Sequence, residues 1–257
     1  MRNAHSFKHL ILEVAEVSRV TLNRPDVRNA FNAELIAELE TVFQGLGSEE
    51  LCRVIVLQAN GKSFCAGADL NWMKSMANFS TQENIADASK MAKMLNTIYA
   101  CPKPVIAKVQ GDAYAGGVGL AAVCDILIAS KNVRFCISEA KLGLLPATIA
   151  PYVIRALGEQ ASRRYFVTAE VFTALQAKEL GFVHELVEPE DLELKANEIC
   201  QSILNNGPLA VTACKKIVSD LSNQPITPTL IEDTVNRIAA IRNTTEAQTR
   251  MKAFLNK

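Results

Sequence analysis

The chain has 257 residues, of which 49% are hydrophobic, so it can bury a sizeable core in one large domain or in two unequal ones. Its 27 lysines and arginines balance 27 aspartates and glutamates, which argues against a general nucleic-acid or membrane-surface binder. No apolar run approaches the roughly 20 residues that span a bilayer. The first ten residues lack the charged start and apolar stretch of a secretory signal, so we expect none.

The cysteines and histidines predict a reduced protein without a metal. The seven cysteines are scattered, odd in number and free of any CxxC pair. The three histidines show no spacing that suits metal ligands. We therefore expect reduced core thiols, a cytoplasmic location and no metal site.

Four short apolar runs rich in β-branched residues predict buried strands, at residues 19–23, 53–58, 104–109 and 126–129. Amphipathic helices are predicted between them, the first with Asn32 as its N-cap and Glu34 in its first turn. Alternating strands and helices indicate an α/β domain. The apolar stripe of the first helix is Leu35, Leu39, Val42, Phe43 and Leu46, and that of a second helix is Ile85, Ala88, Ala92, Leu95 and Tyr99.

Past about residue 190 the helical periodicity is nearly continuous, with breaks at residues 206–208 and 225–228. We therefore predict an α/β core over residues 1–190 and a helical region over residues 191–257.

Residues 62–70 follow a strand and a turn, and their small members Ala66, Gly67 and Ala68 leave backbone N–H groups accessible to a ligand. An ordinary tight connection explains the same pattern.

Residues 110–120 begin where the third strand ends and run into an apolar stretch that is typical of a buried helix. Glycines at such a turn present free amides at the positive end of a helix, which suits an anion or an oxygen that becomes anionic. No lysine follows the glycines, so a nucleotide-phosphate site is disfavoured. Close packing of the helix on a sheet is the alternative.

Glu139 interrupts apolar and small residues in the segment 135–143. A partly desolvated carboxylate has a raised pKa and can exchange protons near neutral pH. A structural glutamate that caps a backbone group or pairs with Lys141 remains equally open.

Together these segments resemble the crotonase (enoyl-CoA hydratase/isomerase) family over nearly the whole chain. Residues 22–31 resemble its first strand and coenzyme A loop, and residues 64–70 and 111–125 resemble its two oxyanion-hole segments. Residues 138–143, with Pro146, resemble its acid–base segment. The resemblance implies a core of repeated β-β-α turns in a spiral, followed by a helical trimerisation region.

The resemblance also implies roles for individual residues. The backbone N–H groups of Ala68 and Gly116 would bind the thioester carbonyl oxygen, and Glu139 would exchange a proton with the adjacent carbon. Coenzyme A is then part of the substrate, so no cofactor or metal is expected, and the partners are an acyl-CoA and further copies of the chain in a homotrimer or a hexamer. The residues expected along coenzyme A are Arg28, Ala30, Lys62, Ala66, Gly67, Ala68, Asp69 and Leu70, with Phe254 and Lys257 reaching the coenzyme A of a neighbouring subunit.

One position departs from the family pattern. Typical hydratases of the family carry a second glutamate where this chain has Gly119. Either Glu139 handles the water alone, or another group takes over, or the reaction is a double-bond isomerisation. The finer match, at residues 116–120 and 145–152, resembles bacterial methylglutaconyl-CoA hydratases of leucine breakdown, which also have glycine there. Related geranyl-pathway enzymes share the pattern.

The leading expectation is reversible hydration of a branched 2-enoyl-CoA, 3-methylglutaconyl-CoA. An enoyl-CoA isomerase that uses the single Glu139 is the second. A non-catalytic acyl-CoA-binding or RNA-associated member of the family is the third. The retained amide donors of Ala68 and Gly116, together with Glu139, argue against it. Lys74 and Lys141 are candidates to face a distal carboxylate of the substrate.

Overall fold

The structure is a computed structural model that describes residues 7–256. The chain divides into two compact units, Met1–Ile199 and Cys200–Lys257. No helix among the described residues is long and apolar enough to cross a membrane.

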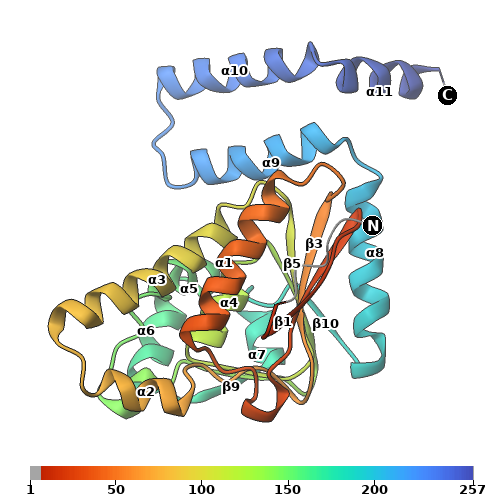
Figure 1. Ribbon diagram of the computed structural model, residues 1–257. Helices are drawn as coiled ribbons and strands as arrows, with labels where there is room; N and C mark the ends of the chain where they lie inside the picture. The colour runs from red at the N-terminus through yellow and green to blue at the C-terminus, as the bar shows by residue number, and fades with distance from the viewer. Residues whose placement is uncertain (1–6, 257) are drawn as a thin grey trace. The chain divides into compact units, whose positions relative to one another are not determined.

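A six-stranded sheet forms the centre of the first unit, in the order β1-β2-β3-β5-β7-β10 (Figure 1). All neighbours pair in parallel except β1 and β2, which are antiparallel. The four predicted strands are confirmed as β2, β3, β5 and β7, whose side chains are almost all withdrawn from solvent. The strands are β1 (Leu10–Glu13), β2 (Val17–Leu22), β3 (Val54–Ala59), β5 (Val105–Val109), β7 (Ile126–Ser130) and β10 (Glu185–Val187).

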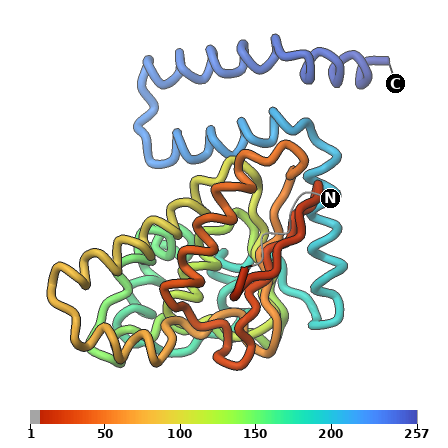
Figure 2. Tube along the Cα trace, viewed as in Figure 1, coloured from red at the N-terminus to blue at the C-terminus, as the bar shows by residue number. Residues whose placement is uncertain are grey.

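A second, four-stranded sheet was not predicted, because its strands are each three residues long and too short to show a periodicity. It runs in the order β4-β6-β8-β9, and each of its first three strands follows a strand of the main sheet along the chain. The chain thus adds one strand to each sheet and then a helix, which is the expected β-β-α spiral (Figure 2). The strands are β4 (Ser63–Cys65), β6 (Asp112–Tyr114), β8 (Arg134–Cys136) and β9 (Val171–Thr173).

Helices α1 (Ala33–Ser48) and α3 (Thr81–Tyr99) pack against each other. The predicted cap of α1 is confirmed, because the Asn32 side chain accepts a hydrogen bond of 2.8 Å from the Leu35 N–H. Every residue of the stripe predicted for α1 is buried. The stripe predicted for α3 is only partly right: Leu95 is buried, but Ile85 is 54% exposed, and the other buried residues are Met91, Met94 and Ile98. Only the C-terminal half of α3 packs on the core. The apolar residues predicted in its N-terminal half therefore have no core to pack against.

The remaining helices of this unit are short. They are α2 (Leu70–Met76), α4 (Gly116–Ala122), α5 (Ala150–Leu157), α6 (Glu159–Thr168) and α7 (Ala174–Glu179), with 3₁₀ turns η1 (Pro25–Val27), η2 (Glu139–Leu142) and η3 (Pro189–Asp191).

Helix α8 (Leu192–Leu204) leads into the second unit, which contains α9 (Pro208–Leu221), α10 (Pro228–Arg242) and α11 (Thr245–Leu255). The two predicted breaks are confirmed, since they fall between α8 and α9 and between α9 and α10. No residue of α9, α10 or α11 is buried, so the apolar side chains of these helices are at least partly exposed to solvent. A cavity of about 600 Å³ is lined by residues of α9 and α10 such as Ala213, Ile217, Ile238 and Ile241.

Within residues 7–256 no cysteine forms a disulfide, and five of the seven are buried. Within residues 7–256, no group of three or more His, Cys, Asp or Glu side chains is arranged to hold a metal ion. The cytoplasmic location inferred from the cysteines stays a prediction.

Candidate active site

The loop after β2 and the segment after β4 are joined by a short parallel bridge between Phe31 and Ala68. The Phe31 N–H donates to the Gly67 carbonyl at 2.7 Å, and the Asp69 N–H donates to the Phe31 carbonyl at 2.8 Å. In this pairing the residue between the two bonds turns its own N–H away from the partner strand. The Ala68 N–H therefore points away from Phe31, and it has no acceptor among residues 7–256.

A second free amide lies at the start of α4. The N-cap Ala115 has a left-handed φ of 48°, and its N–H donates to the Cys136 carbonyl at 2.8 Å. Its own carbonyl accepts from Val118 and Gly119, whereas the N–H groups of Gly116 and Gly117 in the first turn have no acceptor among the described residues. They lie at the positive end of a helix dipole, although the helix is only seven residues long.

Glycines bring these two segments together. A side-chain carbon added to Gly67 would lie 3.1 Å from the Tyr114 carbonyl oxygen and 3.8 Å from the Gly116 nitrogen. One added to Gly117 would lie 2.3 Å from the Cys65 carbonyl oxygen. The glycines thus serve close packing, as the alternative interpretation held, and the same packing places the Ala68 segment beside the start of α4.

Glu139 begins η2, three residues after β8 ends beside Ala115. Its Oε2 atom is buried and has no hydrogen-bond partner among the described residues. Burial raises the pKa of Glu139, an effect that a hydrogen bond from its own backbone opposes. No ion pair joins Glu139 to Lys141 within residues 7–256. A half-buried carboxylate with one oxygen that has no partner, and with a raised pKa, fits the acid–base prediction better than the structural alternative.

Gly119 lies on the buried side of α4 and is covered by Ile149, which is 1% exposed. A side-chain carbon at position 119 would fall 2.1 Å from Ile149 Cγ2 and 2.6 Å from its Cβ. The position where typical hydratases carry a second glutamate is therefore closed by an aliphatic side chain.

The residues predicted along coenzyme A differ in their surroundings. Arg28, Lys62 and Leu70 are exposed, whereas Ala30 is buried. The Asp69 carboxylate is already engaged, because it accepts from the Asn71 N–H at 2.8 Å and pairs with Arg24 at 2.9 Å. Phe254 is exposed on α11 in the second unit. Lys257 lies outside the described residues.

Two residues that hold the site in place were missed by sequence reasoning. Asn29 is fully buried, accepts from the Arg24 N–H at 2.8 Å, and donates to the carbonyls of Asn60 (2.8 Å) and Ser63 (2.9 Å). Arg24 donates to the Ala30 carbonyl as well as to Asp69. Both residues lie in the segment 22–31 that resembles the coenzyme A loop, but an asparagine in a short proline-containing loop predicts a turn and not its partners.

Comparison with known proteins decides the family, because the family model described as enoyl-CoA hydratase/isomerase matches residues 13–257. The chain belongs to the crotonase family. A Legionella pneumophila structure provisionally named an enoyl-CoA hydratase/isomerase (crotonase) is 44% identical, with a TM-score of 0.93 over 98% of this chain and 97% of that one. An enoyl-CoA hydratase from Shewanella pealeana is 38% identical, with a TM-score of 0.95 over 98% of this chain and 95% of that one.

Among the curated proteins, the short-chain-enoyl-CoA hydratase of Clostridium acetobutylicum is 35% identical over 82% of this chain and 81% of its own length. These findings confirm the predicted crotonase family, the crotonase fold and the assignment to a family of enzymes.

Proposed function

We propose that this crotonase-family protein adds water reversibly to a 2-enoyl-CoA thioester. The observation that carries the proposal is the combination of two amides that have no acceptor within residues 7–256, those of Ala68 and Gly116, with the buried Oε2 atom of Glu139, which has no partner there either. The amides can hold an oxygen that becomes negative, and the carboxylate can move a proton beside it.

The proposed reaction uses one carboxylate for both proton transfers. The oxygen of water bonds to C3 of the enoyl group, the π pair of the C2–C3 double bond forms a C1–C2 double bond, and the π pair of the carbonyl moves onto the thioester oxygen. The amides of Ala68 and Gly116 stabilise this enolate, which is where charge develops. Glu139 takes the proton that the water loses and returns it to C2, so the carboxylate is regenerated.

The resemblance to methylglutaconyl-CoA hydratases leads us to propose 3-methylglutaconyl-CoA as the acyl group. Lys141 is exposed two residues from Glu139; burial raises the pKa of the nearby Cys136 thiol, and the positive charge of Lys141 opposes that rise. It is the candidate to face the distal carboxylate of that substrate, with Lys74 on α2 as the alternative.

A double-bond isomerisation is the second candidate, and Ile149 is the observation that favours it. Ile149 leaves no space for a second carboxylate at position 119. An isomerase needs only one group that removes a proton from C2 and delivers one to C4, a role within reach of Glu139 alone.

We also propose that the second unit mediates assembly into a homotrimer or a hexamer. Its helices α9, α10 and α11 bury none of their residues within the chain, and Val218, Ile231 and Val235 are each more than half exposed. Such open apolar faces are typical of protein–protein interfaces. A stable monomer in sedimentation at micromolar concentration would contradict this proposal.

The two reactions can be separated by one optical assay. The conjugated thioester absorbs where its hydrated product does not, so hydration of crotonyl-CoA or 3-methylglutaconyl-CoA lowers the absorbance. Isomerisation of a 3-enoyl-CoA raises it, because conjugation is created. We expect a loss with 3-methylglutaconyl-CoA that Glu139→Gln abolishes. No loss with any 2-enoyl-CoA, together with a gain for 3-enoyl-CoA, would replace hydration by isomerisation.

A further inference from the structure

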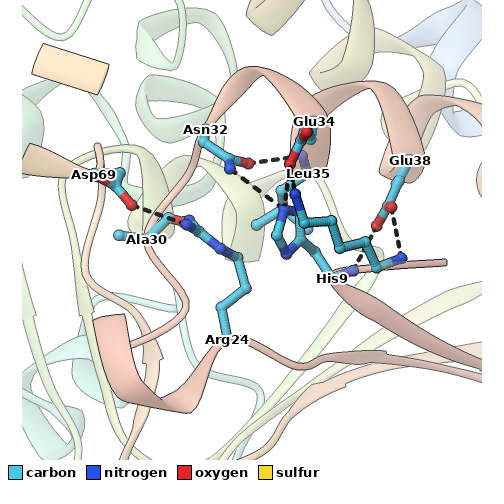
Figure 3. A network of polar contacts seen from close by, with 9 residues as sticks. His9, Arg24, Ala30, Asn32, Glu34, Leu35, Glu38 and Asp69 are labelled. Atoms are coloured by element: carbon cyan, nitrogen blue, oxygen red, sulfur yellow. Dashed lines mark hydrogen bonds and ion pairs between the residues drawn. The ribbon is translucent and has the colours of Figure 1, made fainter. Parts of the chain in front are cut away.

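Arg24 and Asp69 form a largely buried ion pair (Figure 3), and Asp69 directly follows Ala68 of the proposed oxyanion hole. Their side chains are 13% and 9% exposed, and Arg24 Nη2 lies 2.9 Å from Asp69 Oδ2. The other guanidinium nitrogen, Nη1, donates to the Ala30 carbonyl. The second oxygen of Asp69 accepts from the Asn71 N–H and caps α2. One planar side chain therefore links the loop after β2 to the segment that carries Ala68.

These contacts flank the bridge on which the Ala68 amide depends. Ala30 precedes Phe31, and Asp69 follows Ala68, so the guanidinium is bonded to a neighbour of each bridge residue. In a trans peptide, the carbonyl and the N–H point in opposite directions. The bond from Phe31 to the Gly67 carbonyl therefore sets the direction of the Ala68 N–H.

Gly67 does not fix the direction of the Ala68 N–H by its own conformation. Its φ of 88° is one that glycine adopts easily, and glycine has the greatest backbone freedom of any residue. The direction of the Ala68 N–H thus depends on contacts from outside the segment, and Arg24 supplies the side-chain contacts to both strands.

We propose that Arg24 is a positioning residue of the oxyanion hole, which holds the Ala68 N–H toward the thioester oxygen through Ala30 and Asp69. The proposal rests on the proposed function, because it assigns no separate activity. Arginine suits the role, since its fork donates to two acceptors at fixed angles, which a lysine ammonium on a flexible stem does not do.

The charge state of the pair agrees with this role. Burial raises the pKa of Asp69, but the Asn71 and Trp72 amides and the Arg24 guanidinium lower it by more, so it lies below its ordinary value. The carboxylate therefore stays ionised at the pH where the enzyme works, and the link to Arg24 persists.

The test uses a chromophore that reports the hole directly. Cinnamoyl-CoA carries a conjugated thioester, and hydrogen bonds that polarise its carbonyl move its absorption to longer wavelength. We expect a red shift on binding to the wild-type protein and to Glu139→Gln, which keeps both amides. Arg24→Lys and Arg24→Met should lose most of that shift.

Kinetics provide the second readout. Loss of one oxyanion donor costs about 10²–10³-fold in kcat, so a misaligned amide should lower kcat by roughly 10–100-fold. The KM and the affinity for free coenzyme A should change by less than about threefold, since the lost interaction strengthens only in the transition state. Asp69→Asn, which keeps the shape of the partner, should fall between wild type and Arg24→Met.

Arg19→Met is the matched control. Arg19 is also partly buried and ion-paired, with Glu193 at 2.7 Å, but it lies on β2, and its other hydrogen bonds go to Gln58 and Asn197. It should lose stability while its red shift and kcat stay at the wild-type level. Should Arg24→Met fail to fold, Arg24→Lys and Asp69→Asn provide the same comparison.

Two failures are distinguishable. If wild-type protein binds cinnamoyl-CoA without a red shift, the hole at Ala68 and Gly116 is wrong and the proposed function falls with it. If wild type and the Arg24 variants show equal shifts and equal kcat, only the role of Arg24 is overturned. A loss of coenzyme A affinity in parallel with kcat would also overturn it, because that result indicates a general disruption of the loop.

Discussion

The side chain of Ile149 fills the space beside the α-carbon of Gly119, so that a side-chain carbon at position 119 would meet Ile149 Cγ2 at 2.1 Å. This contact changes how the glycine at position 119 is interpreted. From the sequence, Gly119 marks only the absence of a second carboxylate. In the structure it is a position where any side chain requires Ile149 to move.

We therefore expect Gly119→Ala to destabilise the protein, by about 1–3 kcal/mol for an overpacked core site. Gly119→Glu should be worse, and Ile149→Ala combined with Gly119→Glu should recover part of the loss. Urea unfolding measures each step. Gly45→Ala is the control, because Gly45 is exposed in α1 with nothing within 4 Å of its added carbon and should gain about 0.5–1 kcal/mol. Equal effects at both glycines would contradict the contact.

Glu139→Gln should lower turnover by about 10²–10⁴-fold, the usual contribution of a positioned general acid–base. The amide keeps the shape of the side chain but cannot exchange the proton. Binding of acyl-CoA, measured by calorimetry, should change little because both hole donors are backbone groups. Near-normal hydration of every acyl-CoA tested would show that another residue moves the proton.

The same substitution should change how stability depends on pH. The folded-state pKa of Glu139 is raised above its ordinary value of 4.5, so the folded state binds this proton more tightly than the unfolded state. Ionisation therefore destabilises the fold as pH rises through that window. Relative to wild type, the melting temperature of Glu139→Gln should therefore rise between acidic and neutral pH. Below pH 4.5, the ordinary pKa of a glutamate, the two melting temperatures should differ little. Glu159→Gln, at an exposed glutamate on α6, should show no such gain.

His184 should make the protein sensitive to acid. Its Nδ1 accepts a hydrogen bond of 2.9 Å from the Leu127 N–H, and burial, with the charge of Lys178, lowers its pKa below 6.5. The folded state prefers the neutral imidazole ring. The ring therefore stabilises the fold above its ordinary pKa of 6.5, and this stabilisation is lost as the pH falls below that pKa. Stability should decline between pH ~7 and ~5 more steeply in wild type than in His184→Gln. Parallel curves would exclude this residue as the cause.

Deletion of residues 254–257 should weaken coenzyme A binding more than it weakens folding. Phe254 is 76% exposed on α11, so its loss removes little packing within the chain. The family resemblance places these terminal residues on the coenzyme A of a neighbouring subunit. Calorimetry with coenzyme A and thermal unfolding of the same sample compare the two losses. Unchanged affinity would remove the C-terminus from the binding site.

The sequence by itself determined the features that local patterning encodes. Strands β2, β3, β5 and β7 are apolar enough to be predicted singly, and Asn32 is a good cap wherever its helix packs. The order of the motifs was sufficient to identify the family, which comparison confirmed. The spacing around Glu139 left a structural role equally open, and the family resemblance then nominated this residue for proton transfer.

Only the tertiary structure decided which groups are free and which are occupied. Burial of the Glu139 Oε2 atom without a partner among the described residues depends on the surrounding segments, and it favours proton transfer over a structural role. The second sheet consists of strands too short to have a period, and only one half of α3 meets the core. Arg24 and Asp69 are 45 residues apart in sequence, and so their pairing has no local signature. Hydrogen-bond direction is a property of peptide planes fixed by distant contacts, so the sequence could name Ala68 but not orient its amide.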